Sequence, residues 1–189
     1  MALLRLAQAA WRDRRDRRLP GSVRQVMIRE ARPDEHALVG ELRVAAYRAG
    51  GLLSESTGYA DTLRGFGFGG DCAVLVAQDG HGRLVGTVTL EPFGPGSELA
   101  RDETEADIRA FAVDARAQGQ GVGRALLRAV MEHAARGGVR RLRLCTLPTM
   151  EAAQHLYAAA GFTRTSDLDF EPAPGVALRA YELSLPPGE

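Results

Sequence analysis

The sequence predicts one domain of the α/β (α+β) class. Short runs in which apolar residues alternate, typical of strands, are followed by segments in which apolar residues recur every three or four positions, typical of helices. A glycine-rich turn at residues 118–123 joins one strand to one helix in the last third of the chain. A length of 189 residues with 45% hydrophobic content is enough for one substantial core, and a second domain is not expected.

Residues 1–22 are predicted to be an appendage, helical or disordered, in front of a domain that spans residues 23–189. Leu3–Trp11 is apolar, and Arg12–Arg18 alternates arginine with aspartate. The apolar run is too short to cross a bilayer and its charges follow it, so neither a membrane helix nor a secretory signal is expected. A helix that lies on a membrane or docks on a partner stays open. Two other interpretations also stay open. The segment is a loosely attached helix, or the start codon is assigned too early and Met27 is the first residue of the domain.

The first half of the domain is predicted to alternate strands and helices. Pro and Asp favour a helix start, and paired glycines favour a helix end. A valine-rich run and an alternating run on either side of an Asp-Gly turn are typical of a hairpin. The predicted elements are a strand at Val26–Arg29, a helix from Pro33-Asp34 to Gly50-Gly51, a short helix at Ser54–Leu63, and strands at Asp71–Gln78 and Arg83–Glu91 around Asp79-Gly80.

The second half repeats the pattern after a loop. Residues 91–105 are rich in Gly, Pro and acids and show no period, which predicts a loop. Val122, Leu126 and Val130 lie four residues apart on one helix face, which ends at paired glycines. The remaining predictions are strands at Ile108–Val113, Arg141–Thr146 and Leu178–Leu185, a helix from Val122 to Gly137-Gly138, and a helix capped by Thr149 in which Met150, Ala153, Tyr157 and Ala160 share a face while Leu156 points to the core.

The glycine-rich turn predicts an anion site. A helix start leaves backbone N–H groups unpaired and carries a positive partial charge, so a side-chain acceptor or a carboxylate is expected there. The first turn carries Arg124 instead, and a bound pyrophosphate would supply the missing acceptor. No Lys-Ser/Thr follows Gly123 and no glycine stands at Arg124, which excludes a P-loop and a dinucleotide fingerprint. A tight strand-to-helix turn without a ligand is the alternative.

The motifs around this turn resemble those of a known family. Gln118-Gly119-Gln120-Gly121-Val122-Gly123 resembles the Gln/Arg-x-x-Gly-x-Gly/Ala loop of the GNAT superfamily of N-acetyltransferases. Residues 150–157 and Gly161-Phe162 resemble the family's Asn-x-x-Ala-x-x-Leu-Tyr-x-x-x-Gly-Phe signature, with Met150 in place of Asn. The resemblance runs from about Met27 to Leu185 and implies the GNAT fold. That fold is a mixed, mostly antiparallel sheet of about seven strands with about four helices, splayed between strands 4 and 5.

The resemblance implies acetyl-coenzyme A (acetyl-CoA) as the cofactor. In this family the fourth strand pairs with the pantetheine arm as an extra strand would, and amides near that point can stabilise the oxyanion. Because many relatives use Asn at the position of Met150 to bond the pantetheine arm, that contact is in doubt here. The implied cofactor-binding residues are Phe111, Ala112, Val113, Gln118, Gly119, Gln120, Gly121, Val122, Gly123, Arg124 and Tyr157.

The resemblance implies catalytic roles for two residues. Tyr157 is the candidate acid, because a phenol with an ordinary pKa of about 10 still carries the proton that a departing thiolate needs at neutral pH. Asp107 is the candidate base that deprotonates the amine, and it shares a strand face with Arg109 and Phe111 if no bulge intervenes. Asp107 has a rival explanation as an exposed acid at the strand end without a catalytic role, and a water chain is an alternative route for the proton. A nucleophilic role for Cys145, near the expected acetyl site, is a separate alternative.

The predicted function is acetyl transfer to a primary amine by direct attack in a ternary complex; a non-catalytic coenzyme A sensor or partner-binding module is the alternative. The acceptor is a small-molecule or peptide amine. A formal net charge of zero argues against a nucleic-acid partner, and relatives suggest a homodimer. Cys72 and Cys145 lack a CxxC spacing, which favours a reducing, cytoplasmic setting. None of the 4 histidines has the spacing of a metal site.

Overall fold

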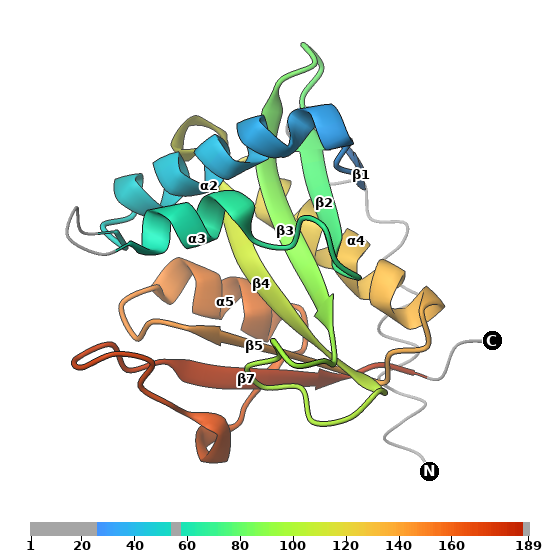
Figure 1. The fold of residues 1–189 in the computed structure, drawn as a ribbon, viewed down its shortest axis with the longest axis vertical. Helices are drawn as coiled ribbons and strands as arrows, with labels where there is room; N and C mark the ends of the chain where they lie inside the picture. The colour runs from blue at the N-terminus through green and yellow to red at the C-terminus, as the bar shows by residue number, and fades with distance from the viewer. Residues whose placement is uncertain (1–25, 54–57, 187–189) are drawn as a thin grey trace.

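The structure, a computed structural model, describes residues 26–53 and 58–186. The appendage predicted at residues 1–22 and the start of the helix predicted at Ser54 lie outside these described residues. At the centre is a seven-stranded sheet of order β1-β2-β3-β4-β5-β7-β6 (Figure 1). In the described ranges, no helix has the length and hydrophobicity that a membrane crossing requires.

The elements alternate along the chain as the sequence predicts. The strands are β1 (Met27–Glu30), β2 (Ala73–Gln78), β3 (Leu84–Pro92), β4 (Glu105–Val113), β5 (Arg141–Thr146), β6 (Thr163–Arg164) and β7 (Arg179–Ser184). The helices are α2 (His36–Ala49), α3 (Tyr59–Gly65), α4 (Val122–Arg136) and α5 (Glu151–Ala159), with 3-10 turns η2 (Pro33–Glu35), η3 (Ala115–Ala117) and η4 (Ser166–Leu168).

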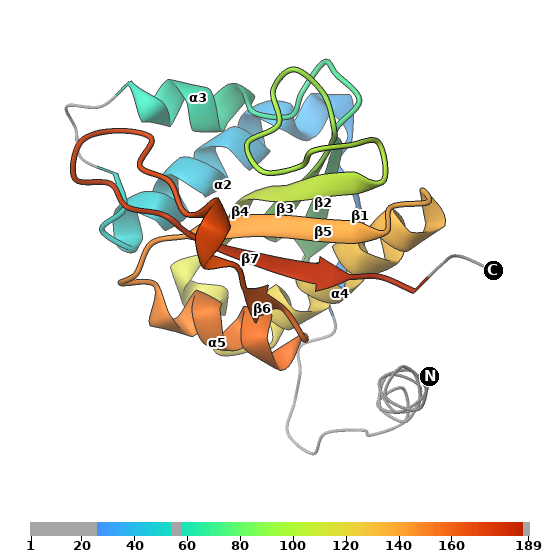
Figure 2. The same ribbon diagram turned by 90° about the horizontal axis from the view of Figure 1, so that it is seen from below.

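The sheet separates the helices into two layers. Figure 2 shows α2 and α3 on one side of the strands and α4 and α5 on the other. Antiparallel pairing joins all neighbours except β4 and β5, which are parallel. The mixed, mostly antiparallel sheet that the GNAT resemblance implied is therefore confirmed.

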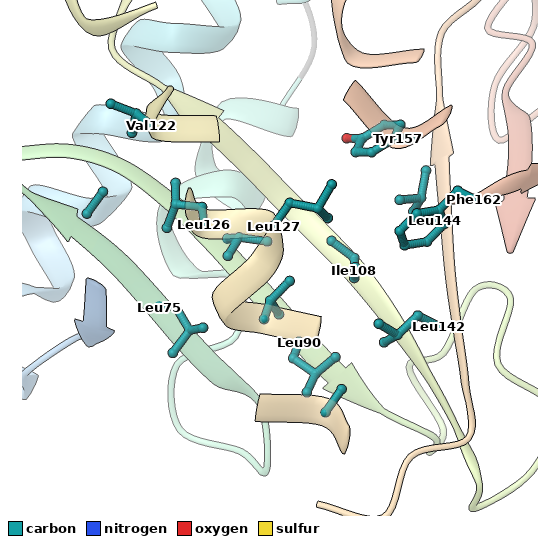
Figure 3. Close-up of a cluster of buried hydrophobic side chains, with 14 of the residues drawn as sticks. Leu75, Leu90, Ile108, Val122, Leu126, Leu127, Leu142, Leu144, Tyr157 and Phe162 are labelled. Atoms are coloured by element: carbon teal, nitrogen blue, oxygen red, sulfur yellow. The ribbon is translucent and has the colours of Figure 1, made fainter. Parts of the chain in front are cut away.

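The main core lies between the sheet and α4. Leu126, Leu127 and Val130 of α4 are at most 1% exposed and pack against strand residues such as Ile108 (Figure 3). α4 approaches β3 closely at Gly86, where an added Cβ would lie 2.8 Å from Leu126 Cδ1. A side chain at this position would therefore displace the packed side chains of Leu126 and Val122.

A bulge in β4 reverses the alternation of its side chains. Thr87 pairs with Ala112 but Thr89 pairs with Arg109, so Ala110 and Phe111 together oppose one residue of β3. Ala110 has a positive φ of 47°, unusual for a residue other than glycine. Phe111 was expected to share a face with Asp107 only if no bulge intervenes, and this condition is not met, because the extra residue turns Phe111 to the α4 and α5 side.

The sheet splits between β4 and β5. The two strands pair at Glu105↔Arg141, Ala106↔Leu142 and Asp107↔Arg143, and no later pair is formed in the described chain. Figure 1 shows the strands diverging from this point. The splay expected between the fourth and fifth strands is present, and it leaves one edge of residues 108–113 open.

Three local predictions need correction. The short helix begins at Tyr59 and ends at Gly65, beyond the predicted end at Leu63. Thr149 does not cap α5, because Met150 stands at the N-cap and no side chain caps it. In α5 it is Tyr157 that enters the core at 5% exposure, whereas Leu156 is half-buried at its edge. Propensity alone did not distinguish these two neighbouring apolar positions.

Candidate functional site

The glycine-rich turn presents an uncapped helix start. α4 begins at Val122, its N-cap Gly121 has a φ of 82°, and within residues 26–53 and 58–186 no side-chain hydrogen bond caps this helix start. The nearest acid, Asp114, accepts the N–H of Arg116 at 2.8 Å and so caps η3 instead. The backbone donors of the first turn therefore combine with the positive end of the helix dipole, the arrangement that favours an anion.

The polar side chains of the turn bond to the turn itself. Gln118 donates from Nε2 to the carbonyl of Val113 at 3.4 Å, and Gln120 donates from Nε2 to the carbonyl of Arg116 at 2.7 Å. Gly119 has a φ of 72°, and an added Cβ would meet no atom within 4 Å. Both glutamines thus fix the loop, and open space lies in front of Gly119.

The open edge of β4 runs toward this helix start. On its β3 side, Ala112 and Val113 pair with Thr87 and Gly86, while the side that faces β5 has no ladder partner in the described part of the chain. Unpaired strand groups are a template for an extended ligand that adds as a further strand. The structure thus places the predicted residues 111–113 and 118–124 on one continuous path.

Tyr157 lies beside that path on the α4 and α5 side of the sheet. Its ring centroid is 6.3 Å from that of Phe111 and 5.9 Å from that of Phe162. Figure 3 shows Tyr157 and Phe162 in the core. Burial raises the pKa of the Tyr157 hydroxyl above its ordinary value of 10.0. The phenol therefore stays protonated at neutral pH, as a proton donor must.

Asp107 lies on the opposite face, where its carboxylate anchors a loop. Oδ2 accepts the backbone N–H groups of Glu98 and Leu99, and Oδ1 accepts that of Ala100, each at 2.9 Å. The residue is 1% exposed, and burial raises its pKa despite these hydrogen bonds. The structure therefore places Asp107 and Tyr157 on different sides of the strand, and it gives Asp107 a full set of backbone partners.

A cluster that the sequence did not reveal surrounds the split on the α2 and α3 side. Arg109 donates to Glu91 at 2.9 Å and to Glu98 at 2.5 Å, and its guanidinium lies 4.4 Å from the centroid of the Phe66 ring. The second oxygen of Glu98 accepts from the thiol of Cys145 at 3.8 Å. Arg109 could have been found from the sequence, because it alternates with Asp107 along the predicted strand and so lies on the same face. Glu98 could not, because its loop shows no period from which the direction of a side chain can be predicted.

Cys145 does not have the electrostatics of a nucleophile. Burial, with the charge of Glu98 next in size, raises its pKa from 9.0 to about 12. A thiol with such a pKa carries almost no thiolate at neutral pH, and thiolate is the reactive form. The contacts therefore make Cys145 a hydrogen-bond donor to Glu98. No group of three potential metal ligands occurs among residues 26–53 and 58–186.

A buried arginine fixes the helices that wall this side of the site. Arg43 of α2 is 0% exposed and donates to the carbonyls of Leu63 and Phe66 and to the hydroxyl of Thr89. Burial lowers its pKa from 12.5 to about 10, so it remains a cation at neutral pH. These bonds join α2 to the end of α3 and to β3, which gives the wall over the split a fixed position.

Comparison with known proteins gives one family. The sequence profile of the acetyltransferase (GNAT) family matches residues 40–162, more than half of the chain. An uncharacterized N-acetyltransferase of Schizosaccharomyces pombe is 30% identical over 112 residues, which are 59% of this chain and 64% of that protein. The mycothiol acetyltransferase of Cellulomonas flavigena is 36% identical over 108 residues, 55% of this chain and 31% of that protein. The chain thus spans less than two thirds of the length of both relatives.

A solved structure shows the same fold. The acetyltransferase YncA of Salmonella typhimurium, determined with its cofactor acetyl-CoA, superposes with a TM-score of 0.67 at 19% identity. The match covers 86% of this chain and 95% of that one. At this identity the likeness concerns the arrangement of strands and helices.

Proposed function

Because the chain belongs to the acetyltransferase (GNAT) family, we propose that it transfers the acetyl group of acetyl-CoA to a primary amine. One observation carries the proposal: the pairing of β4 with β5 ends at Asp107↔Arg143, and the open edge runs to an uncapped helix start. An extended arm with a diphosphate at one end matches both features. The acceptor is a small-molecule or peptide amine.

The residues present fit this cofactor. Backbone groups of residues 111–113 would pair with the pantetheine arm, and the amides of residues 119–124 would hold the diphosphate. The space in front of Gly119 and the positive φ of Gly119 and Gly121 let the backbone itself approach the ligand. When bound, acetyl-CoA supplies the thioester whose carbonyl carbon the amine attacks directly in a ternary complex.

Two groups of this chain support the chemistry that follows. Backbone N–H groups near the bulge at Ala110 would stabilise negative charge on the carbonyl oxygen during attack. Tyr157 would donate its proton to the departing thiolate, consistent with its burial and its raised pKa. For Asp107, the candidate base that the resemblance implies, three backbone hydrogen bonds favour a positioning role.

Calorimetry with acetyl-CoA, followed by an amine screen that detects released thiol, tests the cofactor and the reaction separately. The screen holds spermidine, kanamycin, and a peptide with a free N-terminus and a lysine. We expect submillimolar acetyl-CoA binding and thiol release with at least one amine. Binding without release from any amine would support the coenzyme A sensor instead, and no binding would refute both.

A matched pair of variants tests the diphosphate site. Gly119→Asp and Gly119→Asn are nearly the same size, fit the open space, and tolerate a positive φ better than other side chains. Only the aspartate places a negative charge in front of the helix start. We expect the aspartate variant to bind acetyl-CoA about 10-fold more weakly than the asparagine variant, a difference of about 1.4 kcal/mol. Equal affinities would place the diphosphate elsewhere.

We further propose a cytoplasmic location and a homodimer. Both Cys72 and Cys145 are free, which is typical of a reducing compartment. The homodimer rests on the family resemblance alone, and light scattering of the full chain at several concentrations tests it.

A further inference from the structure

We propose that Glu98, in the loop between β3 and β4, is the general base that removes a proton from the acceptor ammonium. The inference rests on the proposed acetyl transfer and deepens it. It assigns the deprotonation to a loop residue next to the split in the sheet and assigns to Asp107 the task of holding that residue in place.

The position of Glu98 follows from its two side-chain contacts. One oxygen accepts from Arg109 of β4 at 2.5 Å, and the other accepts from Cys145 of β5 at 3.8 Å. Arg109 and Cys145 lie on strands that no longer pair with each other at this point. The carboxylate of Glu98 therefore bridges the open split, and Figure 2 shows its loop over the α2 and α3 side of the sheet.

This side is the one from which an amine would approach. Tyr157 packs in the core on the α4 and α5 side, whereas Arg109 stacks on Phe66 next to α3. An amine that enters over the split would thus have Glu98 on its own side of the thioester and Tyr157 on the other. That separation suits a reaction in which one group accepts a proton and another donates one.

Among the groups of residues 26–53 and 58–186 that face this point, Glu98 alone combines access with a weakly held oxygen. Its side chain is 32% exposed, against 13% for that of Glu91, which is also bonded to Arg109. Asp107 is buried and has three backbone partners. Cys145 and Tyr59 have raised pKa values and stay protonated at neutral pH.

The electrostatic balance at Glu98 suits a base. Burial raises its pKa above 4.5, with Asp107 and Glu91 acting in the same direction, while Arg109 and the Cys145 thiol favour the charged form. A carboxylate that is ionised at neutral pH, with a pKa closer to neutrality than that of a free glutamate, is a better proton acceptor. Arg109 keeps it charged through one oxygen, and the other oxygen, which has only a long contact with the Cys145 thiol among the described residues, would accept the proton of the ammonium group.

The proton balance closes with Tyr157. Glu98 takes one proton from the ammonium and later releases it to solvent, and the neutral amine attacks the thioester carbon. A carbon–nitrogen bond forms and the carbon–sulfur bond breaks. The thiolate takes the proton of Tyr157, and the second proton that the nitrogen loses returns through water to the tyrosine.

The test measures the pH dependence of kcat/KM, with acetyl-CoA and the amine that gives the highest rate in the screen described above. In the wild-type enzyme, kcat/KM should be flat between the pKa of Glu98 and that of the amine, which is about 10 for a lysine side chain and about 8 for a peptide N-terminus. In Glu98→Gln, kcat/KM at pH 7 should fall about 10²-fold or more for an amine of pKa about 10 and about 10-fold for a peptide N-terminus. It should then rise tenfold per pH unit up to the amine pKa, because only amine that is already neutral reacts. Glu98→Asp should keep the flat region at a lower rate.

Controls separate this inference from the proposed function. Glu132→Gln, an exposed carboxylate on α4 at the other face of the sheet, should behave as wild type. Calorimetry should show unchanged acetyl-CoA affinity in both glutamine variants. A Glu98→Gln enzyme with the wild-type rate and pH profile would overturn the inference while leaving acetyl transfer intact. A sharply lower acetyl-CoA affinity in Glu98→Gln would also overturn it. A wild-type protein that releases no thiol would refute the proposed function itself.

Discussion

The buried carboxylate of Asp107 accepts the backbone N–H of Glu98 at 2.9 Å, so a strand residue holds the loop residue that reaches over the split. The same carboxylate also accepts the amides of Leu99 and Ala100. Next to them, Arg143 donates to the carbonyl of Leu99 at 2.6 Å. The loop is thus fixed at its end nearest β4, although it has no regular structure of its own.

Asp107→Asn should destabilise the protein by about 1–3 kcal/mol, because an amide group would face backbone donors that a carboxylate now satisfies. Urea denaturation at pH 7 measures the change. The control is Asp71→Asn, an exposed aspartate before β2, which should change stability by less than about 0.5 kcal/mol.

The same Asp107→Asn variant separates the two roles of this residue. If Asp107 only positions Glu98, the variant should have a lower kcat/KM but keep the flat pH profile of the wild type. A kcat/KM that rises with pH would make Asp107 the base.

Tyr157→Phe should lower kcat about 10²-fold and leave the affinity for acetyl-CoA nearly unchanged, because only the proton donor is removed from a ring that stays packed. Steady-state kinetics and calorimetry measure the two quantities. Tyr181→Phe is the matched control, since this neighbouring ring lies 6.4 Å away and its hydroxyl bonds to Gln154. Equal kcat values in the two variants would remove the acid role of Tyr157.

Glu98→Gln should lower the pKa of Cys145 while leaving it above 9.0, because burial, the larger cause of the raised value, remains. Iodoacetamide labelling as a function of pH, in a Cys72→Ser background, reports the pKa. We expect the labelling midpoint of the glutamine variant to lie at lower pH than that of the parent. Identical midpoints would mean that Glu98 and Cys145 are not in contact in solution.

Glu35 should contribute to acid stability. Hydrogen bonds from Arg29, the larger cause, and from the backbone of Arg32 lower its pKa from 4.5 to about 2. A depressed pKa gives stability that is fully present above pH 4.5 and is lost as the pH falls to about 2. Glu35→Gln should therefore lower Tm at pH 7, and the difference in Tm between the variant and the wild type should be smaller at pH 2.5. A difference in Tm that does not change with pH would contradict the predicted coupling between the ionisation of Glu35 and stability.

The parts of the fold that depend on local pattern were predictable from the sequence. The spacing of Val122, Leu126 and Val130 predicted α4, since apolar residues that recur with a period of about 3.6 residues indicate one buried face of a helix. The Asp-Gly turn fixed the hairpin of β2 and β3, because few other structures use that dipeptide between alternating runs. The glycine-rich turn likewise predicts the uncapped helix start, because it offers no side-chain acceptor to the first amides of α4.

The parts that depend on contacts between distant residues were not predictable. The bulge at Ala110 was not predictable, because a positive φ is usually signalled by glycine and this position holds alanine. The bulge is visible only in the pairing of β4 with β3. Glu98 meets Arg109 and Cys145 only through the fold, 11 and 47 residues away in sequence. Hydrophobic periodicity and composition report on residues that are close in sequence. Whether a carboxylate can act as a general base depends on the residues that surround it in the folded structure.

The division of the helices between the two faces of the sheet has a consequence for how this protein can change. The proposed cofactor path would use β4, the turn and α4, whereas α2, α3 and the loop before β4 lie on the other side of the sheet. On this proposal, substitutions on the α2 and α3 side would alter which amine fits without disturbing the diphosphate turn. Acceptor preference would then be open to selection or engineering, independently of the acyl donor.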